Sequence, residues 1–262
     1  MSLVGLCSAH GSPGVTTTAL AFAATWPEHR RCLLVEADSF GGVIGARYRL
    51  GDTPGLSSLA AVARGGLDEE AVWRNVQQLP GGVPVLVGPA SAEEAHAVLA
   101  DVAGVLAAWC TTQTDLDVVV DCGRIGPTSP VVEMLTRADA VMVLARGSLD
   151  QLRPAAHRLT ALKTSGVEAS LLLVGDSPYR PDEVAATLNV EVGGVIAWDP
   201  RTAAVLTGAR GAVRDLRRSP LVRSAATLTD RLTSSLPGSS RSDGTTSRAP
   251  VGEVEVAEEA RR

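Results

Sequence analysis

The stretch SLVGLCSAHGSPGVTTTALAFAA, residues 2–24, decides the fold. An apolar run leads into small residues, two glycines and consecutive threonines, and an apolar segment follows directly. A strand, a glycine-containing loop and a helix make the outline of a phosphate-binding loop, whose backbone N–H groups and helix N-terminus face an anion. The loop contains no lysine, because Val15 stands where such a loop places its phosphate-binding lysine. The sequence therefore predicts a phosphate cradle that lacks its main charge.

Apolar strand-like segments and helix-like segments alternate along the rest of the chain. This alternation predicts a single α/β domain with a doubly wound, mostly parallel sheet of about seven or eight strands and helices on both faces. Any ligand should lie over the carboxyl ends of the strands, at residues 9–18, 38–42 and 121–126. The predicted strands are 2–7, 31–38, 82–89, 116–123, 139–147, 168–176 and an edge strand, 192–200; the predicted helices are 17–26, 55–66, 68–76, 91–110, 129–138, 149–166, 180–189 and 219–236.

The composition changes near residue 236. Residues 237–262 are rich in Ser, Gly, Thr and charged side chains and contain no large apolar residue apart from valines. A segment of this kind cannot bury enough apolar surface to offset its loss of conformational entropy. We therefore expect a folded domain over residues 1–236 and a disordered tail over 237–262.

Composition excludes several classes of protein. The net charge of −5 gives no basic footprint for nucleic acid. No apolar run is long enough to predict a transmembrane segment, and the first residues lack the pattern of a secretory signal. The cysteines are widely spaced, which predicts reduced thiols in a cytoplasmic protein; they are Cys7, Cys32, Cys110 and Cys122.

The loop HGSPGVTTT, residues 10–18, resembles the deviant loop K-G-G-V-G-K-T-T of the MinD/ParA family of P-loop ATPases. The two align without a gap. Val15 replaces the loop lysine, and His10 replaces the signature lysine that reaches the partner subunit's nucleotide. The resemblance assigns nucleotide binding to His10, Gly11, Ser12, Pro13, Gly14, Val15, Thr16 and Thr17, with Thr16 also a Mg²⁺ ligand.

Two acidic strand ends extend the resemblance. LLVEADSFGG, residues 33–42, is similar to the family's L-I-D-A-D-P-Q-G, which implies that Asp38 is the catalytic carboxylate that positions the attacking water. Glu36 takes the place of the first acidic residue of that motif. LDVVVDCGRIG, residues 116–126, is similar to Y-D-Y-V-I-I-D-T-P-P-G, which implies that Asp121 serves Mg²⁺. The similarity covers residues 2–236, although no Asn for adenine stands near Gly175.

The missing lysine sets the expected activity. A lysine on the phosphates makes charge-assisted hydrogen bonds of about 1.5–3 kcal/mol each. Its loss should weaken ATP binding roughly ten- to a hundredfold. His10, Arg124 and Arg146 are candidates for substitute charge, and each is equally compatible with a plain surface residue.

The resemblance implies ATP and Mg²⁺ as cofactors, bound weakly or lost, and leaves open whether the chain hydrolyses ATP. It implies a positioning or assembly factor of the kind found among degenerate CpaE/TadZ-like relatives. Partner proteins of a pilus, secretion, septum or chromosome-placement machinery, a nucleotide-dependent homodimer and a peripheral association with the membrane through a partner are further expectations. The alternatives are an active Mg-ATP-dependent ATPase of the chromosome-partitioning or septum-site type, and a ligand-free partner-binding scaffold.

Overall fold

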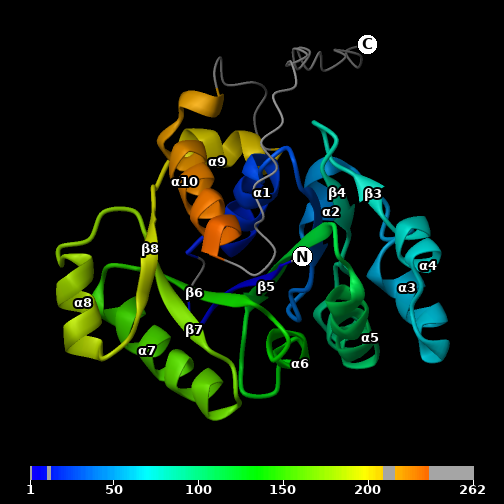
Figure 1. Cartoon of the computed structure of the whole chain (residues 1–262), viewed down its shortest axis with the longest axis horizontal. Coiled ribbons are helices and arrows are strands. Elements are labelled where there is room, and N and C mark those ends of the chain that lie inside the picture. Colours follow the sequence, from blue (N-terminus) through cyan, green and yellow to red (C-terminus); the bar gives the residue numbers. More distant parts are fainter. Residues whose placement is uncertain (1, 11–12, 209–215, 236–262) are drawn as a thin grey trace.

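The computed structural model describes residues 2–10, 13–208 and 216–235. In this part of the chain eight strands form one sheet in the order β3-β4-β2-β5-β1-β6-β7-β8, and only the β3–β4 pair is antiparallel. The predicted doubly wound, mostly parallel sheet is confirmed (Figure 1). The strands are Leu3–Ser8 (β1), Arg31–Glu36 (β2), Gln77–Gln78 (β3), Pro84–Leu86 (β4), Leu116–Arg124 (β5), Ala140–Arg146 (β6), Ala169–Val174 (β7) and Val192–Ile196 (β8).

Helices cover both faces of the sheet because the central strands are apolar on both sides. In β5, Val118 and Val120 pack into one core cluster and Val119 packs into the other. The helices on the Val119 face are Val15–Thr25 (α1), Ile44–Tyr48 (α2), Pro200–Leu206 (α9) and Pro220–Ser235 (α10). Those on the opposite face are Leu56–Val62 (α3), Glu69–Arg74 (α4), Ala92–Thr112 (α5), Val132–Leu135 (α6), Leu149–Thr164 (α7) and Pro181–Leu188 (α8).

The last described helix, α10, packs on the domain as its apolar face predicts. Leu221, Ala225 and Leu228 are buried in the same cluster as α1. Gly194 of β8 makes room for this contact, because a Cβ there would lie 2.5 Å from Leu228 Cδ2. The predicted disordered tail, residues 237–262, lies outside the described residues.

Several elements differ from the sequence prediction. The segment 129–138 forms only the single turn α6, and α2, β3 and α9 were not predicted. The segment 192–200 is a strand only as far as Ile196. Asp199 then caps α9 by accepting a hydrogen bond from the N–H of Thr202, and Pro200 occupies the first helical position. An Asp–Pro pair is a signal for the start of a helix, so the predicted end of the strand at residue 200 is wrong.

Helix α5 is long and apolar enough to cross a membrane, by length and composition only. It lies instead on the sheet, where Leu99, Val102 and Leu106 are buried in the core. Its buried side chains thus account for its apolar composition.

A buried carboxylate ties the first strand–helix–strand unit to β5. Asp117 is almost fully buried and accepts hydrogen bonds from Trp26 Nε1, at 2.8 Å, and from the Arg30 guanidinium. The side chain of Arg30 is itself only 15% exposed. Removing one partner from a buried pair leaves the other partner uncompensated.

Replacing Asp117 by Ala should therefore lower the free energy of unfolding by about 3 kcal/mol. Urea denaturation measures this change. The matched control is Asp115→Ala, because Asp115 forms an ion pair with Arg31 on the surface and both side chains are at least half exposed. That control should cost less than about 1 kcal/mol. Equal losses in the two variants would contradict the structural role of Asp117.

Candidate functional site

The predicted phosphate loop joins the end of β1 to the start of α1 at the carboxyl edge of the sheet. Gly14 lies in the left-handed region, with φ 101° and ψ 39°, and it precedes the first helical residue, Val15. No side chain caps this end of the helix among the described residues. The first-turn N–H groups of α1 therefore remain available to an anion.

The residues of the loop have different surroundings. His10 is exposed, Pro13 is buried, and Thr16 and Thr17 are half-buried. The side chain of Val15 is only 6% exposed and belongs to the core cluster between the sheet and α1. The position expected to carry a lysine is thus occupied by a core residue. The predictions for Gly11 and Ser12 lie outside the described residues.

Asp121 is the most unusual group at this edge. It is fully buried; its Oδ1 accepts a hydrogen bond from the N–H of Gly123 at 3.0 Å, and its Oδ2 has no hydrogen-bond partner among the described residues. Burial raises the pKa of Asp121 to about 7, and the charges of Glu36 and Asp38 raise it further. The Thr16 hydroxyl lies close enough to lower this pKa, although it makes no hydrogen bond of normal geometry with the carboxylate. A buried carboxylate oxygen with no partner requires an explanation.

Glu36 serves the structure of the loops. Its Oε1 accepts hydrogen bonds from the backbone N–H groups of Val43 and Ile44, and its Oε2 accepts one from Gly88. Burial raises its pKa, and these three N–H groups oppose the rise. Because its oxygens are already engaged, Glu36 anchors the segments after β2 and β4.

Asp38 is half-buried and lies beside Gly123. A Cβ on Gly123, which has φ 56°, would lie 1.9 Å from Asp38 Oδ2, so the backbone and the carboxylate can approach closely only at a glycine. Asp38 Oδ1 accepts a hydrogen bond from the N–H of Phe40 at 2.9 Å. Burial raises the pKa of Asp38, and the Phe40 N–H and the Arg124 charge lower it.

Thr16, Asp38 and Asp121 therefore gather at the uncapped end of α1. The described residues contain no group of three or more His, Cys, Asp or Glu side chains placed to hold a metal by themselves. A Mg²⁺ ion in a nucleotide site needs fewer protein ligands, because phosphate oxygens and water complete its shell. The unpartnered Oδ2 of Asp121 and the Thr16 hydroxyl fit that chemistry.

Two exposed aromatic residues near this edge were not assigned a role from the sequence. Phe40 and Trp198 are 50% and 49% exposed, and each lies under a guanidinium, that of Arg124 and that of Arg146 respectively. The signal available in the sequence was their scarcity, because aromatic residues make up only 3% of the chain.

No protein-family model and no curated protein matches the chain. Solved structures do. The cell division ATPase MinD of Pyrococcus furiosus has a TM-score of 0.71 and 17% sequence identity, with 89% of this chain and 98% of that chain covered. The fold is that of the MinD/ParA ATPases.

Two further structures share this MinD/ParA fold. The septum site-determining protein MinD of Pyrococcus horikoshii, complexed with Mg-ADP, has a TM-score of 0.70 and 16% identity, covering 88% of this chain and 95% of that chain. A ParA family ATPase of Chlorobium tepidum has a TM-score of 0.66 and 17% identity, covering 88% and 98% respectively. These likenesses establish the fold over nearly the whole described domain.

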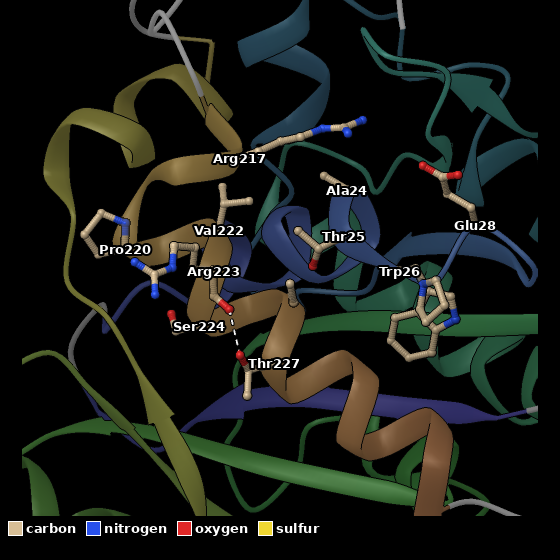
Figure 2. Close-up of a pocket in the computed structure, with 12 residues that line it drawn as sticks. Ala24, Thr25, Trp26, Glu28, Arg217, Pro220, Val222, Arg223, Ser224 and Thr227 are labelled. Atoms are coloured by element: carbon tan, nitrogen blue, oxygen red, sulfur yellow. Dashed lines mark hydrogen bonds between the residues drawn. The ribbon is translucent and has the colours of Figure 1, made fainter. Parts of the chain in front are cut away.

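A separate hollow of about 800 Å³ lies between the C-terminal end of α1 and the first turns of α10 (Figure 2). Trp26, Glu28, Arg217 and Arg223 are among its lining residues. Helix α1 has 11 residues, so this hollow lies about 16 Å along the helix from the phosphate loop. It is therefore distinct from the predicted ligand site.

The burial of Asp121 predicts a pH dependence of stability. Its carboxyl binds a proton more tightly in the folded state than in the unfolded state, where the ordinary value is 3.8. Ionisation of Asp121 therefore opposes folding, and its contribution to the free energy of unfolding falls as the pH rises from 3.8 to about 7.

In metal-free buffer, Asp121→Asn should therefore be more stable than the wild type at pH 8, and this difference should shrink toward pH 4. Urea denaturation at several pH values measures the difference. Asp115→Asn, which replaces an exposed carboxylate, is the matched control. A difference between wild type and Asp121→Asn that is constant with pH would contradict this account of the buried carboxylate.

Proposed function

We propose that this chain is a MinD/ParA-type nucleotide-binding protein that positions or assembles cellular machinery and hydrolyses ATP weakly or not at all. The observation that carries the proposal is the buried, unpartnered Oδ2 of Asp121 beside the Thr16 hydroxyl, at the uncapped N-terminus of α1. A carboxylate in this position is costly without a cation. A Mg²⁺–nucleotide complex would supply both the cation and the anion that the site lacks.

Each residue has a distinct part in the proposed binding. The backbone at Gly14 and the first turn of α1 directs N–H groups at the phosphates. Thr16 and Asp121 would hold Mg²⁺, which neutralises phosphate charge when bound. Asp38 is fixed by the Phe40 N–H and by its contact with Gly123, so it can orient a water molecule near the terminal phosphate.

Weak turnover follows from the absence of lysine. Val15 is a core residue, and His10 is exposed at the start of the loop. Charge on the phosphates stabilises the transition state as well as the bound nucleotide, so its loss affects hydrolysis more than binding. This reasoning favours a protein whose nucleotide acts as a structural ligand.

Similar folds occur in proteins that act with partners. One structure of this fold, from Aquifex aeolicus, is a MinC:MinD cell division protein complex, and another is a putative plasmid partition protein of Borrelia burgdorferi bound to AMPPNP. By analogy we propose that this chain recruits a partner protein, and that a CpaE/TadZ-like role in pilus or secretion assembly suits its altered loop. A nucleotide-dependent homodimer and an association with the membrane through a partner are part of the same proposal.

The second candidate is an active ATPase of the partitioning or septum-site type, because Asp38 and Asp121 are both present at the site. Calorimetric titration with Mg-ATP and measurement of phosphate release separate the candidates. We expect weak binding by the wild type and phosphate release at the level of the buffer. Turnover that disappears in Asp38→Ala would establish the ATPase instead. No binding at millimolar ATP would leave a ligand-free scaffold.

Restoring the lysine tests the cause of weak binding. Val15 is the first residue of α1, so a lysine there can keep its alkyl stem in the core cluster and extend its ammonium group to the phosphates. Val15→Lys should therefore tighten Mg-ATP binding at least about tenfold, because it returns charge-assisted hydrogen bonds to the phosphates. Val15→Met, which has a long side chain without charge, is the matched control and should bind like the wild type. Thermal unfolding checks that both variants are folded. Equal affinities in the two variants would show that the missing charge does not limit binding.

A further inference from the structure

We infer that Arg124 and Arg146 supply the positive charge that the phosphate loop lacks, as a pair of guanidinium groups that bind the phosphates of the nucleotide from the two strands beside the loop. The inference rests on the proposed nucleotide binding. The two arginines would take the place of the lysine that the loop lacks.

The sheet places both arginines at the entrance of the loop. Strand β1, which leads into the loop, lies between β5 and β6. Its last residue, Ser8, is paired with Arg124 of β5 on one side and with Leu144 of β6 on the other, two residues before Arg146. The N–H of Ile125 donates to the carbonyl of Ser8 at 2.9 Å, so the end of β5 lies directly beside the end of β1. Neighbouring strands are about 5 Å apart, so the backbones of the two arginines flank the end of β1. In the structure their side chains extend outward to rings beyond β5 and β6, and they would have to turn toward the loop to meet a ligand.

Arg124 is held over the acidic side of the site. Its guanidinium carbon lies 4.3 Å from the centre of the Phe40 ring, and Phe40 donates its backbone N–H to Asp38. The charge of Arg124 also lowers the pKa of Asp38. The stacked guanidinium is therefore close to the carboxylate that would face the terminal phosphate.

Arg146 is held on the other side by Trp198, with 3.9 Å between the guanidinium carbon and the ring centre. The indole lies against Gly175 at the end of β7, where a Cβ would be 2.7 Å from Trp198 Cβ. Gly175 has φ 74°, so a side chain at this position would be both strained and obstructed. Gly175 therefore leaves room for Trp198, which supports Arg146.

Neither guanidinium has a carboxylate within ion-pair distance in the part of the chain that the structure describes. Stacking on a ring face leaves the N–H groups at the edge of the guanidinium free to donate. An exposed cation–π contact is weaker than a hydrogen bond to a charged group. Phosphate oxygens can therefore compete for both groups, and the rings keep the arginines in place until a ligand binds.

The test measures affinity for Mg-ATP, Mg-ADP and Mg-tripolyphosphate by calorimetry, using the full chain. Arg124→Ala and Arg146→Ala should each weaken binding about tenfold, and the double variant should weaken it further. Arg→Lys at either position should restore part of the loss. Arg223 is an exposed residue of α10 that lines the hollow beside the C-terminal end of α1. Arg223→Ala is the control for net charge and should bind like the wild type. Thermal unfolding confirms that each variant is folded.

A second readout follows the indole itself. Binding of Mg-tripolyphosphate should change the tryptophan fluorescence of the wild type, because Arg146 shifts relative to Trp198. The change should be reduced in both Trp198→Phe and Arg146→Ala, and it should persist in Arg223→Ala. If Arg146→Ala removed the fluorescence response to Mg-ATP but kept the response to Mg-tripolyphosphate, Arg146 would recognise the base rather than the phosphates. That result would overturn the inference.

The outcomes separate the two proposals. If the wild type binds Mg-ATP and both arginine-to-alanine variants bind it equally well, the inference fails and the proposed function stands. If the wild type binds none of the three ligands, the proposed function fails and the inference fails with it. A loss of affinity in Arg124→Ala or Arg146→Ala that is matched by Arg223→Ala would reduce the effect to net charge and also contradict the inference.

Discussion

The parallel pairing of β1 between β5 and β6 is the constraint on which the site depends. It brings Ser8, Arg124 and Leu144 into one row at the carboxyl edge of the sheet. The same register pairs Leu6 with Asp121, so the buried carboxylate lies beside the last residues of β1, just before the loop. Sequence positions more than a hundred residues apart thus lie side by side at one edge of the sheet.

The electrostatics of this edge are unbalanced in the isolated chain. Asp38 and Asp121 are brought together, burial raises the pKa of both, and the lysine that would offset them is replaced by a core valine. Functional sites often contain such perturbed groups. Arg124 already offsets part of the charge at Asp38, and a cation bound beside Asp121 would offset the rest. We propose that the site then retains a nucleotide rather than hydrolysing it rapidly.

Much of this arrangement could be predicted from the sequence. Alternating apolar segments indicated the parallel sheet, whereas the roles of Asp38 and Asp121 were implied by the resemblance to the MinD/ParA motifs and remain predictions. The rest depends on contacts between distant segments. Nothing local to Trp198 indicates that it supports Arg146, and nothing local to Asp117 indicates its bonds to Trp26. Glu36, which resembles an acidic motif residue, proves to anchor loops, because its oxygens accept three backbone N–H groups.

The most direct test of the account is a crystal structure of the protein with Mg²⁺ and a non-hydrolysable ATP analogue. We expect the phosphates at the backbone of Gly14 and the first turn of α1, with Mg²⁺ beside Thr16 and Asp121 Oδ2. A guanidinium of Arg124 or Arg146 should then lie within hydrogen-bond distance of a phosphate oxygen. An analogue bound away from the loop, or phosphates that neither arginine contacts, would contradict the account.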